Sequence, residues 1–235
     1  FGAKGLVWLR VTDAGVDGPS AKHMSDQEKR QLVERCGAGA GDMVLLVAAE
    51  EKVCFPSLGA LRLEVGRRLE LIDTDRFAFA WVTEFPLFEW SDEEQRHVSM
   101  HHPFTSPVEQ DIGLLQTDRY HTARARAYDL VLNGNEVAGG SIRIHEPEVQ
   151  RAVFARLGIG EEEAESKFGF LMKAFTYGAP PHGGIAFGLD RLVMVMRGLQ
   201  TIRDVIAFPK TTAGLSPMDG APDRVAAEQL RERGI

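Results

Sequence analysis

Apolar and polar positions along the chain predict a mixed series of strands and helices. Residues 6–11 and 42–48 are rich in aliphatic and aromatic side chains and predict two strands. Between them, Ser25 and Glu28 have the spacing of a helix-capping pair, and Gly37 is a natural end for that helix. Together they predict a small α+β unit over residues 1–56, closed by Pro56.

Residues 57–235 predict a second, larger unit. Leucine and valine at positions 58, 61, 65 and 69 fall on one helical face, and this helix is the candidate hinge between the units. The most specific local signal is Asn133-Gly134, which predicts a hairpin. We expect strands over residues 77–85, 128–132, 136–145 and 183–190, helices over 147–157, 161–177, 191–197 and 224–233, and an irregular tail over 208–223. The expected fold class is therefore α+β.

Composition is that of an ordinary globular protein. Hydrophobic residues make up 44% and charged residues 26%, which argues against disorder. The two cysteines form no CxxC pair, which argues against a structural zinc site and favours a reducing, cytoplasmic compartment. The longest apolar run, residues 43–49, is too short to cross a bilayer, so we expect no membrane partner. The net charge of −7 argues against a dedicated polyanion-binding module.

The predicted hairpin carries the first candidate chemistry. A two-residue turn places Asp129 and Glu136 on one face as diagonal neighbours, roughly 7–8 Å apart at Cα. Two carboxylates at that separation repel unless a cation lies between them, and Mg²⁺ with one or two carboxylates and substrate phosphates meets that need. Two solvent-exposed acids on an ordinary hairpin are the alternative.

Arg143 falls on the opposite face from Glu136 if the strand alternates strictly. Glycines within the strand favour a bulge, which we predict between Val137 and Ile142. One bulge there turns Arg143 onto the Glu136 face, where its guanidinium would suit an anionic substrate beside a metal-bound phosphate. A regular ladder through this stretch would contradict the prediction.

Gly188, Leu189, Asp190 and Arg191 lie where a predicted strand meets a predicted helix. Glycine lets a ligand approach the backbone, a helix N-terminus favours phosphate, and Arg191 could pair with a phosphate or stack on a base. An ordinary strand–helix junction with Asp190 as N-cap is the alternative.

His101 and His102 could supply a proton donor or a hydrogen bond to a carboxylate. A buried histidine whose hydrogen bonds are satisfied within the core is the alternative for each. Cys54 has no sequence feature of a nucleophile and is interpreted as a core residue.

Taken in order along the chain, these segments closely resemble bacterial-type aspartyl-tRNA synthetase, a class II enzyme. The resemblance covers nearly the whole chain, and residues 188–191 look like motif 3 of that class. The start of the chain resembles the latter part of the GAD insertion domain. The segments that carry the resemblance are residues 2–6, 21–22, 58–63, 100–107, 127–134, 136–145, 168–170, 177–191 and 202–210.

The resemblance implies the C-terminal part of a class II catalytic core, an antiparallel sheet with flanking helices, over residues 57–235. It implies a truncated GAD insertion domain over residues 1–56. It also implies a role for each matching residue: Asp129 and Glu136 hold Mg²⁺; Glu136, Gly188, Leu189, Asp190 and Arg191 bind ATP; His101, His102 and Arg143 bind L-aspartate; and Arg191 and Glu136 act in catalysis.

The implied reaction has two steps. The α-carboxylate of aspartate attacks the α-phosphorus of ATP, giving aspartyl-adenylate and pyrophosphate, and the aspartyl group then passes to the 3′ end of tRNA. The implied partners are tRNA(Asp) and, as an open alternative, tRNA(Asn), with homodimerisation of the full-length protein through motif 1. Catalysis in such a site is mainly positioning and charge neutralisation.

Some features depart from the family pattern. Ala138 stands where a third glycine is usual, and Glu84 replaces a common aspartate. The chain opens within a predicted strand, without methionine, and we find neither motif 1, motif 2 nor an anticodon-binding domain in it. We therefore expect a fragment that lacks full activity alone.

Two other functions are considered: a GAD-containing, non-catalytic module of a tRNA-dependent amidotransferase, and a related asparagine-specific synthetase or asparagine-forming enzyme. The combination of Glu136, Arg143 and the 188–191 segment disfavours the first, and Arg143 disfavours the second because it favours an anionic side chain.

Overall fold

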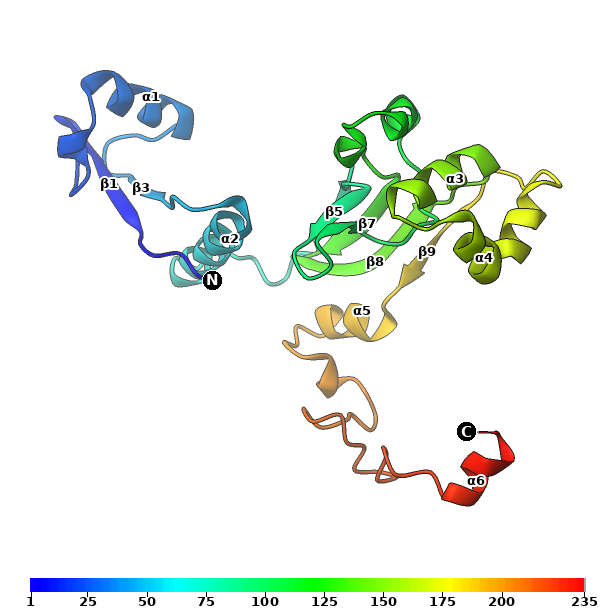
Figure 1. Cartoon of the computed structure of the whole chain (residues 1–235). Coiled ribbons are helices and arrows are strands. Elements are labelled where there is room, and N and C mark those ends of the chain that lie inside the picture. Colours follow the sequence, from blue (N-terminus) through cyan, green and yellow to red (C-terminus); the bar gives the residue numbers. More distant parts are fainter. Residues whose placement is uncertain (235) are drawn as a thin grey trace. The chain divides into compact units, whose positions relative to one another are not determined.

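The computed structural model describes residues 1–234, and the chain divides into two compact units, Phe1–Asp75 and Arg76–Ile235. The expected boundary after residue 56 lies inside helix α2 (Glu51–Arg68), which continues through Pro56. The helix begins before the leucine stripe that predicted it, and the whole of it belongs to the first unit. The division between the units therefore comes after the helix, at residue 75. Figure 1 shows the elements of each unit, coloured along the sequence.

The first unit contains a three-stranded antiparallel sheet and two helices. Strands β1 (Val7–Thr12), β2 (Gly15–Asp17) and β3 (Met43–Leu46) are ordered β2-β1-β3. The predicted capping box is confirmed: Ser25 and Glu28 bond reciprocally at the start of α1 (Asp26–Cys36), and Gly37 ends that helix with φ 59°. The 3₁₀ helix η1 (Ala21–His23) precedes it. Leu9, Val11, Ala21 and Val44 form the buried core of this unit.

The second unit is built on a four-stranded antiparallel sheet. Its strands, in the order β4-β7-β8-β9, are β4 (Phe79–Thr83), β7 (Ala127–Leu132), β8 (Asn135–Ile142) and β9 (Gly183–Phe187). The unit also contains a hairpin of β5 (Phe88–Ser91) and β6 (Arg96–Ser99). Its helices are α3 (Pro147–Arg156), α4 (Glu161–Phe175), α5 (Leu189–Met196) and α6 (Ala227–Glu232), and its 3₁₀ helices are η2 (Glu109–Gln116), η3 (Tyr120–Thr122) and η4 (Ile202–Asp204).

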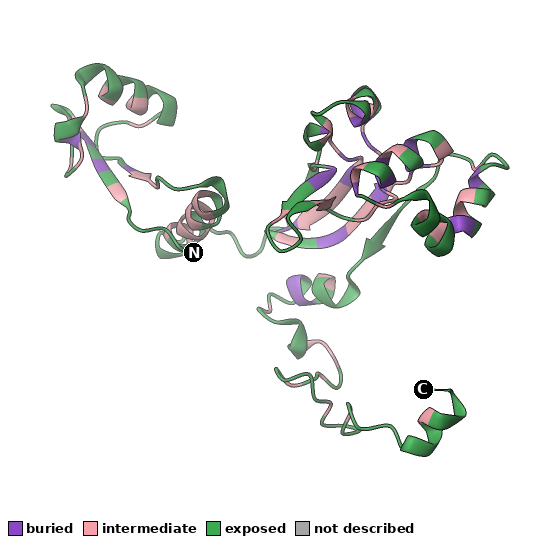
Figure 2. Cartoon of the chain, viewed as in Figure 1, coloured by how far each residue is buried: buried purple, intermediate pink, exposed green. Residues whose placement is uncertain are grey.

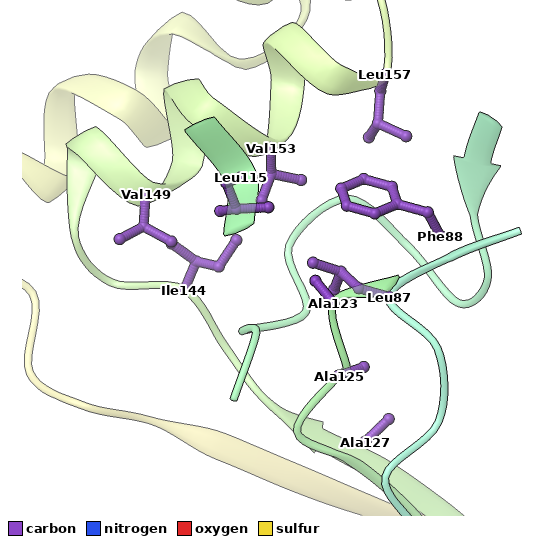
Figure 3. Packing of buried hydrophobic residues seen from close by; sticks show 10 residues of the cluster. All are labelled: Leu87, Phe88, Leu115, Ala123, Ala125, Ala127, Ile144, Val149, Val153 and Leu157. Carbon is purple, nitrogen blue, oxygen red and sulfur yellow. The ribbon is translucent and has the colours of Figure 1, made fainter. Parts of the chain in front are cut away.

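Two buried clusters anchor this unit. In the larger, Figure 3 shows Leu157 facing Phe88, Val153 beside Leu115 and Val149 beside Ile144. In the smaller, Leu132 and Val137 of the hairpin pack with Met194 and Val195 of α5. The second cluster ties helix α5 to the strands that carry the candidate carboxylates.

The outer strands of the four-stranded sheet are open to solvent. Every residue of β4 and β9 is exposed, and Figure 2 shows β9 in the exposed colour over its whole length. Within residues 1–234, no helix combines the length and apolarity that a bilayer crossing would need.

The predicted hairpin is confirmed in detail. Asn133 and Gly134 form its two-residue turn with φ 48° and 80°, the left-handed conformation that a type I′ turn requires at both positions. In contrast, the β5–β6 hairpin was not predicted from the sequence, because residues 89–96 are dominated by acidic and other polar side chains.

Candidate active site

Asp129 and Glu136 converge over a glycine. Asp129 of β7 pairs with Gly139 of β8, and a methyl group added to Gly139 would lie 2.7 Å from Asp129 Oδ1 and 3.5 Å from Glu136 Oε1. Both carboxylates therefore reach the space that this missing side chain leaves free. Asp129 is partly buried and Glu136 is exposed, so a ligand from solvent can approach the pair.

A bulge lies in β8 directly after Glu136. Val131 pairs with Glu136 but Leu130 pairs with Ala138, so Val137 is the extra residue on β8. The predicted bulge is present, but at Val137, the N-terminal limit of the predicted interval, and the ladder from Ala138 to Ile142 is regular. Because Glu136 pairs with Val131, two residues from Asp129 on β7, the two acids are diagonal neighbours as expected; the bulge changes only the residue opposite Asp129, which is Gly139.

Arg143 lies on the same face as the carboxylates. Gly139 pairs with Asp129 and Ser141 with Ala127, so the alternation from Gly139 through Ser141 assigns Arg143 to the Asp129 face. Glu136 pairs with Val131. Val131 and Asp129 are two residues apart on β7 and so share a face, which places Glu136 on that face as well. The expected consequence of the bulge is therefore confirmed: one face of the hairpin presents two carboxylates and one guanidinium.

His102 contacts this arginine. Its Nδ1 lies 3.0 Å from Arg143 Nη1 and accepts a 3.2 Å hydrogen bond from the Phe104 backbone N–H. Burial, then the charge of Arg143, then that of His101, lowers the pKa of His102 from its ordinary value of 6.5. The ring is therefore neutral near pH 7.

His101 is exposed, and its ring packs edge-on against Phe85 with centroids 5.0 Å apart. The structure thus separates the two histidines: His102 is bonded to Arg143, whereas His101 is left to contact solvent or a ligand.

The segment Gly188–Arg191 reaches the carboxylate pair through Arg191. Arg191 Nη1 donates a 2.7 Å hydrogen bond to the Glu136 carbonyl and lies 4.0 Å from Glu136 Oε2. Gly188 precedes the first turn of α5, and its N–H bonds to the Val137 carbonyl at 2.9 Å. Leu189 and Asp190 are exposed in that first turn, and the Asp190 side chain does not cap it.

An open cavity of about 310 Å³ lies at this junction, lined in part by Glu136, Gly188, Asp190 and Arg191. A side chain at Gly188 would meet only ordinary van der Waals neighbours, so packing within the protein does not require glycine there. Close approach of a ligand to the backbone remains the reason that fits.

The residues present fit a hard cation held jointly with phosphate. Across residues 1–234, no group of three or more His, Cys, Asp or Glu side chains could hold a metal alone. Asp129 and Glu136 supply two carboxylates around one open space, which matches Mg²⁺ because this ion usually completes its coordination with water and substrate phosphates.

Two supporting residues were missed in the sequence. Gln150 is fully buried on α3, and its Nε2 donates a 2.8 Å hydrogen bond to the carbonyl of Pro103, next to His102. Thr105 is 1% exposed and bridges to Arg143 in antiparallel register. A glutamine among the apolar positions 149, 153 and 154 of one helical face was the available signal for Gln150.

A family model for class II tRNA synthetases (D, K and N) matches residues 13–212. The chain therefore belongs to that family. Aspartate–tRNA(Asp/Asn) ligase of Caldanaerobacter subterraneus subsp. tengcongensis is 53% identical over 235 residues, which are 100% of this chain and 40% of the relative. The enzyme of that name from Moorella thermoacetica is 55% identical over 232 residues, 99% of this chain and 38% of the relative.

A protein named aspartate–tRNA ligase, from Lysinibacillus sphaericus, is 51% identical over 235 residues, 100% of this chain and 40% of its own. The chain thus spans about 40% of the length of these curated relatives. Among solved structures, aspartyl-tRNA synthetase from Entamoeba histolytica matches with a TM-score of 0.46 and 22% identity, over 80% of this chain and 31% of that one.

Proposed function

We propose that this chain provides part of the active site of an aspartate–tRNA ligase, which activates L-aspartate with ATP and transfers it to tRNA. The observation that carries the proposal is the placement of Asp129, Glu136 and Arg143 on one face of a bulged hairpin, with Arg191 bonded to Glu136. The relatives named as aspartate–tRNA ligases support the choice of substrate.

In this proposal Arg143 binds the side-chain carboxylate of aspartate through paired N–H donors. His101 contacts the amino acid from the exposed side of the same site. The α-carboxylate of aspartate then attacks the α-phosphorus of ATP, and pyrophosphate leaves. Binding both reactants beside one another supplies much of the rate enhancement by orientation.

Arg191 and the backbone of Gly188–Asp190 bind ATP beside the cavity of α5, with the guanidinium facing the phosphates. Asp129 and Glu136 would hold Mg²⁺, which when bound neutralises phosphate charge and orients the leaving pyrophosphate. Glu136 serves both groups, because its carbonyl fixes Arg191 while its carboxylate faces Asp129.

The proposed partner in the second step is tRNA(Asp), with tRNA(Asn) as an alternative that the two names of the relatives leave open. The GAD insertion domain expected over residues 1–56 is proposed to lie within the first unit, the whole enzyme to be a homodimer, and its place of action to be the cytoplasm. Since the chain spans about 40% of its relatives, we expect aminoacylation only from a protein that includes the remaining length.

The test is ATP–pyrophosphate exchange by the natural full-length protein with aspartate or asparagine as the amino acid. We expect exchange with aspartate, and a loss of roughly hundredfold or more in Glu136→Gln because both the Mg²⁺ and the ATP sites change. Glu148→Gln, on the exposed surface of α3, is the matched control and should leave exchange unchanged. Exchange with asparagine alone, or full activity in the Glu136 variant, would contradict the proposal.

A further inference from the structure

Arg143 is held by a neutral acceptor. His102 Nδ1 accepts from two N–H groups, Arg143 Nη1 at 3.0 Å and the Phe104 N–H at 3.2 Å, and the Thr105 hydroxyl lies 3.5 Å from both ring nitrogens. A nitrogen that accepts from two N–H groups cannot carry a proton itself. The geometry therefore requires the tautomer of His102 with its proton on Nε2.

Arg124, in the same unit, is held in the opposite way. Its guanidinium pairs with Asp111 Oδ2 at 2.9 Å and with Glu84 Oε1 at 3.0 Å, so carboxylates of the protein offset its charge. Within residues 1–234, Arg143 takes part in no ion pair of 4.0 Å or less. It is therefore oriented without being neutralised.

The segment that carries His102 is itself fixed. Buried Gln150 bonds to the Pro103 carbonyl, and the Ile144 N–H bonds to the Phe104 carbonyl at 2.9 Å. The charged or titratable groups that face His102 are Arg143, from the end of β8, and His101, from its own segment. No carboxylate of the described chain is among these groups, so no neighbouring charge stabilises the protonated form of the His102 ring.

We propose that His102 is a specificity-determining positioning residue: as a neutral acceptor it orients Arg143 while leaving the arginine charge free for a substrate carboxylate. The identity of that carboxylate, the side chain of aspartate, rests on the proposed function. A carboxylate in place of His102 would compete with the substrate for the guanidinium, and an imidazolium would repel it. Acid therefore removes the acceptor that orients Arg143, by protonating His102.

The tautomer is tested in the natural full-length protein, with histidine ¹⁵N-labelled, by long-range ¹H–¹⁵N NMR of the His102 ring over a pH series. We expect Nδ1 unprotonated and Nε2 protonated near pH 7, and a titration midpoint below 6.5. Arg143→Met should raise that midpoint, because Arg143 contributes to lowering it. A proton on Nδ1 near pH 7, or a midpoint at or above 6.5, would overturn the proposal whether or not the chain binds aspartate.

The specificity is tested in the natural full-length protein with the nearly isosteric pair His102→Asn and His102→Asp. Both offer an oxygen acceptor, but only aspartate adds a negative charge. We expect KM for aspartate in H102D to exceed that in H102N by roughly tenfold or more, from the neutralised arginine. The decline of aspartate kcat/KM toward acid pH should flatten in H102N. Equal KM values in the two variants would overturn the proposal, whereas absence of aspartate-dependent exchange in the unsubstituted protein would overturn the proposed function instead.

Discussion

Gly139 shows how much one absent side chain contributes to the site. It lies opposite Asp129 in the β7–β8 ladder, and its missing methyl group is what allows both carboxylates to face the same space. Its own φ lies outside the left-handed region, so backbone conformation does not require glycine there. The requirement comes from the carboxylates above it.

Gly139→Ala should raise the Mg²⁺ concentration needed for half-maximal aspartate-dependent exchange. The new methyl group would lie 2.7 Å from Asp129 Oδ1, so that carboxylate must move away from Glu136. Gly184→Ala on neighbouring β9 is the control, since a methyl group there meets nothing within 4 Å. Identical Mg²⁺ dependence in the two variants would count against the metal site.

His102 makes folding stability depend on pH with a definite sign. Folding lowers the pKa of His102 from its ordinary value of 6.5. Between pH 6.5 and the lowered pKa, the unfolded chain therefore binds a proton at His102 more strongly than the folded chain does. Stability should therefore fall as pH drops from about 6.5 to the lowered pKa, and this component should be absent in His102→Asn. Urea unfolding at about pH 7 and about pH 5.5 measures it. An equal pH effect in both proteins would contradict the assignment.

At the scale of elements, the ion pairs of Arg124 reinforce segments that are otherwise connected by isolated backbone bridges, Pro86 with Arg124 and Pro107 with Ala125. Asp111 of η2 is 8% exposed and accepts hydrogen bonds from the Arg124 side chain and from its backbone N–H at 3.0 Å. These hydrogen bonds, the side-chain bond first, lower the pKa of Asp111. Arg124 also forms an ion pair with Glu84, which follows β4 and has φ 59°. Its side chain therefore connects three segments that precede the β7–β8 hairpin: the end of β4, η2 and its own segment before β7.

Arg124→Met should destabilise the second unit by about 1–3 kcal/mol, because it leaves a nearly buried carboxylate with the backbone N–H of residue 124 but without its guanidinium partner. Lys167→Met breaks an exposed pair with Glu163 within α4 and should cost no more than about 0.5 kcal/mol. Urea unfolding compares them. A cost for Arg124→Met as small as that of the control would refute the role of this ion pair.

The sequence predicted elements best where a local rule dominates. The Ser25 capping box and the turn at Asn133 and Gly134 depend on neighbouring residues alone, and both were predicted correctly. The start of α2 was misplaced because Pro56 normally ends helices, although in this chain it sits within the early turns of one. The bulge was placed slightly too far along β8, since glycines mark where a strand can deform and not which residue is extra.

The candidate site divides in the same way. Asp129, Glu136 and Arg143 could be assigned to one face because strand alternation and a single bulge determine it. The hydrogen bond between Arg143 and His102 joins residues that are 41 positions apart in the sequence. The one between Gln150 and the Pro103 carbonyl joins residues 47 positions apart, so only the folded chain reveals either contact.

At the scale of the whole molecule, each of the two units has a core of its own. The first core is centred on Leu9, which is fully buried, and the second unit contains the clusters around Leu115 and Leu132. Because none of the three clusters draws buried residues from both units, damage to one core should stay local.

Leu9→Ala should cost the first unit about 2–5 kcal/mol, the range for a buried leucine. Leu69→Ala, at a side chain 62% exposed, is the control and should change little. Hydrogen exchange is the measurement, and we expect faster exchange in β1, β3 and α1 with that of β7 and β8 unchanged. Faster exchange of equal size in β7 and β8 would show that the units unfold as one.

The central claim is that Arg143 selects a carboxylate-bearing amino acid for reaction with ATP. The most direct test is kcat/KM for aspartate and for asparagine in ATP–pyrophosphate exchange by the full-length protein, with Arg143→Gln compared with Arg126→Gln. Arg126 is the control because it is partly exposed and makes only a 3.8 Å pair with Glu109. We predict that Arg143→Gln lowers kcat/KM for aspartate by roughly hundredfold and that Arg126→Gln leaves it unchanged. Unchanged aspartate kcat/KM in Arg143→Gln would contradict the claim.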